Sequence, residues 1–189
     1  MYLDLVPNIP TYRRDDGVGG SHQLVDVDSA QTLTSKTLTA PVLNAPTLTG
    51  VKAANVASGT GVVLTAAQSG AILLFDSATA ALLYTLPAPA FGLTFTFIWT
   101  VSVTSGTSKV ITDASGTKLM GAAYLGIAAG TGTTFYADGT THRSLNANGT
   151  TTGGLLGGIA YFYCVTGTQW EVDVVVEGSS TIATPFATT

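Results

Sequence analysis

Between Gln31 and Gly50 the chain repeats a five-residue unit, which reads QTLTS KTLTA PVLNA PTLTG. Leucine holds the third position of every unit, and a serine, alanine or glycine closes it. A period of five matches neither the 3.6-residue period of an α-helix nor the two-residue period of a β-strand. The repeat therefore predicts an extended segment that becomes ordered by packing against other chains. The repeated leucines are Leu33, Leu38, Leu43 and Leu48.

Leucine burial alone cannot order this segment. A straight strand would turn successive leucines to opposite faces, and Pro41 and Pro46 lack the N–H that a central strand requires. Ordering about 20 residues costs ~20–40 kcal/mol of backbone entropy, whereas burying four leucines returns only ~6–12 kcal/mol. We therefore predict that residues 31–52 form an extended stem made by more than one chain. The alternative is a flexible Thr/Pro/Ala linker whose spacing is accidental.

Residues 1–30 show no lasting helical or strand period, but they carry more apolar anchors than a disordered tail would. Such a composition is typical of a peptide that docks onto another protein. We expect these residues to act as a docking arm. Its predicted contact residues are Tyr2, Leu3, Leu5, Ile9, Tyr12, Arg13 and Arg14.

The overall composition favours an all-β protein. The chain is 46% hydrophobic and 10% charged, with 22 glycines and a mean hydropathy of +0.40, and part of its apolar surface is expected between subunits. Its net charge of −4 gives no electrostatic case for nucleic-acid binding. The N-terminus lacks the basic and apolar regions of a signal peptide, and the apolar runs are too short for a membrane helix. The single cysteine, Cys164, lies in an apolar run and is expected to be a buried, inert thiol.

Residues 53–189 are predicted to form one β domain with little helix. Residues 93–103 place Phe95, Phe97 and Trp99 opposite a row of threonines, which is typical of a half-buried strand. Turn signals such as Asp138-Gly139 and Asn148-Gly149 separate the runs, and the strand spacing favours an antiparallel β-sandwich or a jelly roll. The expected strands are 61–66, 71–76, 81–86, 93–103, 109–113, 133–137, 158–166 and 169–176.

No set of residues predicts an active site, a metal or a cofactor. The chain contains neither a phosphate loop nor a G-x-S-x-G nucleophile elbow. His22 and His142 are isolated in polar loops, and Asp26 and Asp28 lack the further ligands of a calcium loop. Two further carboxylates, Glu171 and Asp173, could share one strand face, which we interpret as a solvated surface. We therefore expect a protein that is not an enzyme.

Three segments resemble proteins of tailed bacteriophages. Residues 29–50, SAQTLTSKTLTAPVLNAPTLTG, resemble a motif of fibre and head-fibre proteins of the kind QTLTNKTLTSP. Residues 64–103 resemble the β domain of phage capsid decoration and head-fibre proteins, in which a TLP segment (residues 85–87 here) precedes a GL.FTF strand (residues 92–97 here). Residues 161–173, YFYCVTGTQWEVD, are similar to the last hairpin of that domain.

This resemblance implies a homotrimer on the outside of the capsid, made in the cytoplasm of the bacterial host. Residues 1–30 would bind the major capsid protein, residues 31–52 would form a three-chain stem, and residues 53–189 would form the head. The chain stops at Thr189, where some fibres continue into long repeats. We therefore expect a compact decoration (cement) protein or a short head fibre that holds capsomers together.

Two other classes remain open. A tail-fibre or baseplate protein that binds a host-surface glycan would expose aromatic side chains, for which Tyr124, Phe135 and Tyr136 are the candidates. A glycan-cleaving enzyme would need paired carboxylates in a cleft.

Overall fold

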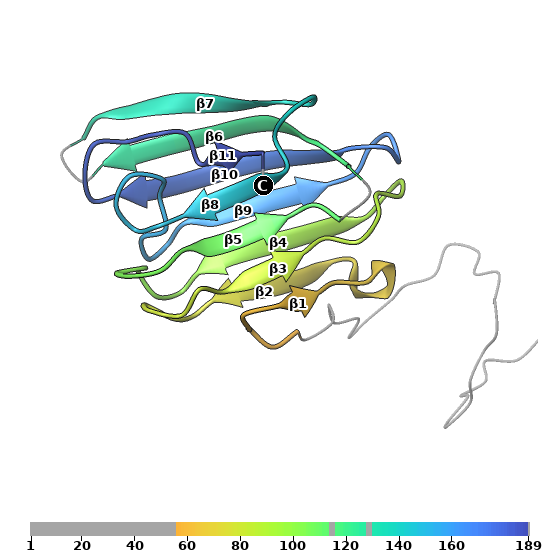
Figure 1. The fold of residues 1–189 in the computed structure, drawn as a ribbon, viewed down its shortest axis with the longest axis horizontal. Coiled ribbons are helices and arrows are strands. Elements are labelled where there is room, and N and C mark those ends of the chain that lie inside the picture. The colour runs from red at the N-terminus through yellow and green to blue at the C-terminus, as the bar shows by residue number, and fades with distance from the viewer. Residues whose placement is uncertain (1–55, 114–115, 128–129, 189) are drawn as a thin grey trace, which may run out of the picture. The chain divides into compact units, whose positions relative to one another are not determined.

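The computed structural model describes residues 56–113, 116–127 and 130–188 (Figure 1). These residues form strands and one 3₁₀ turn, η1 (Ala66–Gln68), with no α-helix among them. The low helix content expected from the sequence is confirmed for this part of the chain. The strands are β1 (Val62–Val63), β2 (Ala71–Phe75), β3 (Leu83–Thr85), β4 (Thr94–Trp99), β5 (Ser108–Ile111), β6 (Leu119–Ile127), β7 (Gly132–Asp138), β8 (Ser144–Ala147), β9 (Ile159–Tyr163), β10 (Trp170–Gly178) and β11 (Phe186–Ala187).

The strands form two sheets packed face to face, which confirms a β-sandwich. One sheet has the order β1-β3-β5-β8-β11, and the other has the order β2-β4-β9-β10-β6-β7 (Figure 1). The expectation of purely antiparallel sheets was wrong, because both sheets are mixed. Strands β1 and β3, β3 and β5, β2 and β4, and β6 and β10 pair in parallel.

Three of the four parallel pairs, those among β1 to β5, follow from the path of the chain. From β1 to β5, successive strands alternate between the two sheets. A chain that crosses to the other sheet and returns enters its first sheet in the original direction, so that β3 runs parallel to β1 and β4 runs parallel to β2. Sequence patterns mark where strands lie, but they do not reveal this alternation between sheets.

Aromatic side chains fill the space between the sheets. The ring of Phe97, from β4, lies 5.3 Å from those of Tyr84 and Phe162 and 5.8 Å from that of Phe75, measured between centroids. The hydroxyl group of Tyr84 donates a hydrogen bond of 2.8 Å to the carbonyl of Leu74, which joins β3 of one sheet to β2 of the other. Burial raises the pKa of the Tyr84 phenol to about 12, and the charge of Asp76 adds to the shift.

The predicted alternation of the two longest patterns is confirmed. Along β4, Phe95, Phe97 and Trp99 are buried, and along β10 the residues from Trp170 to Val176 alternate between core and surface. Cys164 is buried as expected, and its thiol lies 3.1 Å from the carbonyl of Gln169.

Three strands were not predicted from the sequence, namely β6, β8 and β11. The sequence of β6, LMGAAYLGI, is rich in small residues and shows no clean alternation. It nevertheless pairs along its length with β10 on one side and β7 on the other. Gly121 permits this approach, because a Cβ at that position would lie 2.1 Å from the carbonyl oxygen of Val172 in β10.

Candidate functional site

The outer face of the six-stranded sheet carries a continuous row of largely apolar side chains. The register places Leu74 of β2 beside Ile98 of β4, Ile98 beside Ile159 of β9, and Ile159 beside Val175 of β10. Val175 in turn lies beside Tyr124 of β6. The row therefore crosses the sheet from its β2 edge to β6, on the side that faces away from the core.

Several members of this face are exposed to solvent. Val175 is 57% exposed. Ile72 is 54% exposed, and it lies two residues before Leu74 on the same side of β2. Tyr161 of β9 is also exposed, and Ile98 and Ile159 are half-buried. We call the five residues on β2, β4 and β9 the apolar patch. Its members are Ile72, Leu74, Ile98, Ile159 and Tyr161.

Carboxylates on β10 border the apolar patch. Asp173 lies beside Tyr161 in the register, and Glu171 lies beside Tyr163. The hydroxyl group of Tyr163 donates a 3.2 Å hydrogen bond to Asp173. Desolvation, followed by the negative charge of Asp173, raises the pKa of Tyr163. The two carboxylates thus share one face of β10, as predicted, and they lie on an open sheet surface.

Beside the patch, β6, β7 and β10 form a shallow groove of about 350 Å³. Its lining includes Tyr124, Thr134 and Glu177, together with Gly126 and Gly132. Of the three aromatic residues proposed as exposed, Tyr124 and Tyr136 lie on this outer face, with exposed fractions of 53% and 71%. Phe135 does not, because it alternates to the other side of β7 and packs against the core.

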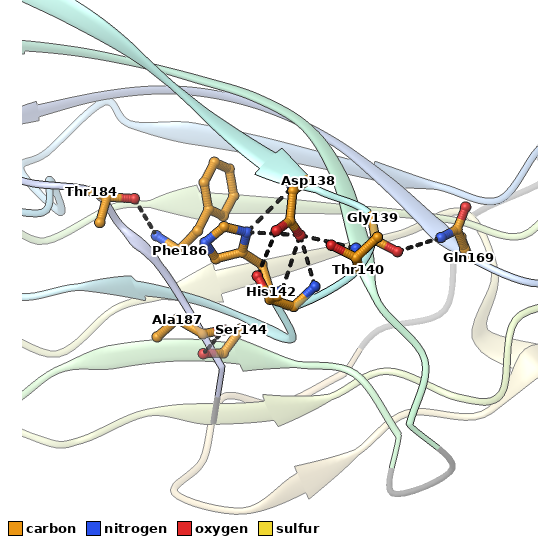
Figure 2. Close-up of polar contacts among 10 residues, drawn as sticks. Asp138, Gly139, Thr140, His142, Ser144, Gln169, Thr184, Phe186 and Ala187 are labelled. Carbon is orange, nitrogen blue, oxygen red and sulfur yellow. Dashed lines mark hydrogen bonds and ion pairs between the residues drawn. The ribbon is translucent and has the colours of Figure 1, made fainter.

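A second polar cluster occupies the turn that follows β7 (Figure 2). The carboxylate of Asp138 accepts hydrogen bonds from the hydroxyl group of Thr141 at 2.6 Å and from the backbone N–H groups of Thr141 and Thr140 at 2.8 and 2.9 Å. These bonds stabilise the ionised form, with the Thr141 hydroxyl group contributing most. They hold the pKa of Asp138 well below its usual range.

His142 belongs to this turn. Its Nδ1 atom lies 3.2 Å from the Asp138 carboxylate and 3.2 Å from the Asp138 backbone nitrogen, while its ring packs 5.9 Å from that of Phe186 in β11 (Figure 2). The sequence placed His142 alone in a polar loop, where a histidine is expected to be exposed to solvent; this expectation was wrong, since the side chain is half-buried. The Asp138 carboxylate is used in hydrogen bonds within its own turn. We interpret the cluster as a structural contact between the end of β7 in one sheet and β11 in the other.

All predicted arm and stem residues lie outside the described residues. They are Tyr2, Leu3, Leu5, Ile9, Tyr12, Arg13, Arg14, Leu33, Leu38, Leu43 and Leu48. The outer-face row and the groove were missed, because both depend on which strands are neighbours. The alternation of buried and exposed residues along β4 and β10 was the one sequence signal that indicated an outer face of the six-stranded sheet.

Within the described ranges, no group of three histidine, cysteine or acidic side chains could hold a metal ion. No helix in this part of the chain is long and apolar enough to span a membrane. Comparison with family models, with curated proteins and with solved structures found no match.

Proposed function

We propose that this chain is a structural protein of a phage particle, which sits on the outside of the capsid as a homotrimer and holds neighbouring capsomers together. The apolar patch is the observation that carries the proposal. Monomeric proteins rarely leave adjacent large apolar side chains uncovered across several strands, and such surfaces mark protein contacts. The resemblance of residues 29–50, 64–103 and 161–173 to phage decoration and head-fibre proteins supports the same function.

Covering this face contributes favourable free energy to association, against a cost of association of roughly 4–15 kcal/mol. Ile72, Leu74 and Tyr161 are each about half exposed, with fractions between 38% and 54%. Completing the burial of three such side chains contributes roughly 2–5 kcal/mol per subunit, at ~1.5–3 kcal/mol for a full burial. In this proposal a second copy of the chain covers the patch, and the stem leucines add contacts between copies.

The proposed arm makes the protein a cement by mass action. A protein that binds the assembled shell and not its free subunits stabilises the shell, by an amount that grows with its free concentration relative to its Kd. Residues 1–30 would supply that binding, with the major capsid protein as partner. Removing residues 1–30 is expected to abolish capsid binding while leaving the β domain soluble. Full capsid occupancy by the truncated protein would contradict the role of the arm.

Gold-labelled antibody against the β domain tests the location on intact particles by electron microscopy. Label over the capsid is the expected result. Label confined to the tail would favour the second candidate function, a tail-fibre or baseplate protein that binds a host-surface glycan. The exposure of Tyr124 on the outer face favours that second function, because exposed aromatic rings commonly stack on sugars.

A further inference from the structure

The groove between β6, β7 and β10 has a specific structural origin. Gly126 of β6 lies between Glu177 of β10 and Gly132 of β7 in the register, so that two neighbouring positions of the outer face carry no side chain. Tyr124 and Thr134, the next register pair on the same face, stand beside this gap. The missing side chains leave a hollow between the side chains of the neighbouring positions on this face. Its volume of about 350 Å³ falls at the small end of the ~300–1,000 Å³ typical of ligand sites.

The glycine at position 126 is not required by the backbone. Its φ lies outside the left-handed region, and a Cβ there would meet the nearest atoms, Cγ of Glu177 and the carbonyl oxygen of Thr131, at 3.7 and 4.0 Å, which are ordinary contacts. A β-branched residue would suit the strand better than glycine does. Gly132 is required by strand geometry, because a Cβ there would lie 2.8 Å from the carbonyl oxygen of Leu125, but the missing side chain at position 126 is not explained in this way.

The lining combines a flat apolar surface with hydrogen-bonding groups. Tyr124 offers an exposed ring, and Val175 continues the apolar wall. Glu177 offers a carboxylate that can accept hydrogen bonds from hydroxyl groups, and the hydroxyl group of Thr134 can both donate and accept. A pyranose has the matching pattern, because its C–H face packs on an aromatic ring while its hydroxyl groups project sideways.

The charges of the lining restrict the class of ligand. No lysine or arginine is among the described residues that line the groove, and its one charged side chain is the acidic Glu177. A sialylated, sulfated or phosphorylated sugar would meet like charge there without a compensating cation. We propose that the groove binds one end of a neutral oligosaccharide, with Tyr124 as the stacking platform and Glu177 and Thr134 as hydrogen-bonding groups. This inference stands apart from the capsid location and from the number of subunits.

The test uses the full-length protein and a panel of neutral oligosaccharides of glucose, galactose, mannose and N-acetylglucosamine, with sialylated and sulfated sugars as the contrast. Saturation-transfer NMR and calorimetry measure the binding. At least one neutral sugar should bind, with its ring protons receiving saturation from the protein, while the anionic sugars should not. Absence of binding by every neutral sugar up to about 10 mM, or a preference for the anionic ones, would overturn the proposal.

Three variants locate the binding site. Tyr124→Ala removes the stacking surface, and Gly126→Val fills the hollow without touching the tyrosine; each should weaken binding at least fivefold. Tyr136→Ala is the matched control, because Tyr136 is exposed on the same face of the sheet and does not line the groove. Unchanged affinity in both Tyr124→Ala and Gly126→Val, or an equal loss in Tyr136→Ala, would place the sugar elsewhere. These outcomes are independent of the oligomer mass and of particle labelling, which test the proposed capsid function.

Discussion

Replacing Gly149 with alanine should destabilise the β-sandwich far more than the same change at Gly70. Both glycines have positive φ, +75° and +84°, so both substitutions carry the cost of a left-handed alanine, ~1–2 kcal/mol. They differ in their surroundings. A Cβ at Gly70 meets nothing within 4 Å, whereas a Cβ at Gly149 would lie 1.7 Å from the carbonyl oxygen of Val103.

Relieving that overlap requires the backbone to move by more than an ångström. The carbonyl of Gly149 accepts hydrogen bonds from the N–H and hydroxyl groups of Ser179, and its N–H donates to the carbonyl of Gly153 at 2.6 Å. Overpacking costs ~1–3 kcal/mol, and loss of one such hydrogen bond costs ~0.5–1.5 kcal/mol. We therefore expect Gly149→Ala to lower the free energy of unfolding by about 2–4 kcal/mol more than Gly70→Ala does.

Urea unfolding followed by tryptophan fluorescence measures the difference, because Trp99 and Trp170 are both buried. With a denaturant slope of about 2 kcal/mol per molar urea, the midpoint of Gly149→Ala should fall about 1–2 M below that of Gly70→Ala. A difference between the two variants below about 0.5 kcal/mol would refute the close approach of this turn to Val103.

Three further predictions concern single side chains. Trp170 donates a hydrogen bond from Nε1 to the carbonyl of Pro87 at 3.2 Å, whereas the buried Nε1 of Trp99 has no partner among the described residues. Trp170→Phe should therefore lower the free energy of unfolding in urea by about 1 kcal/mol more than Trp99→Phe does. Equal losses in the two variants would contradict this. Tyr84 has a pKa raised from 10.0 to about 12, so its contribution to stability is full below pH 10 and is lost as the pH rises through about 12; Tyr84→Phe should flatten this part of the pH–stability curve, and an unchanged curve would be inconsistent with the burial of the phenol. Asp138 has a lowered pKa, so its contribution is full above the ordinary value of 3.8 and is lost as the pH falls below it; Asp138→Asn should reduce the acid sensitivity of the melting temperature, and an equally steep decline in the variant would argue against the turn hydrogen bonds.

The fold could be predicted from the sequence where a strand has one face in the core. The alternation of β4 and β10 identified the buried side chains of both strands correctly. It failed for β6, whose small residues are accommodated between two neighbouring strands, and for β8 and β11, which have four and two residues. Short strands hold their place through pairing with distant parts of the chain, as Phe186 does beside Leu145.

The candidate site was less accessible to sequence reasoning than the fold. Tyr124 was identified from its residue type, but the hollow beside it depends on Gly126 and Gly132 meeting across two strands. The apolar patch likewise unites Leu74, Ile98 and Ile159 from three separate strands. Such sets form only when the strand order is known, and the parallel pairing produced by the alternation between sheets made that order hard to foresee.

The mass of the full-length protein in solution is the most direct measurement of the proposed assembly. Light scattering at micromolar concentration should give three times the 19.2 kDa chain mass. Ile98→Lys, which places a charge in the centre of the apolar patch, should shift the protein towards the monomer, whereas Thr94→Lys, at an exposed position of the same strand outside the patch, should leave the trimer intact. A clean monomer of the unaltered chain, or a trimer that Ile98→Lys does not weaken, would contradict the assignment of this face to contacts between subunits.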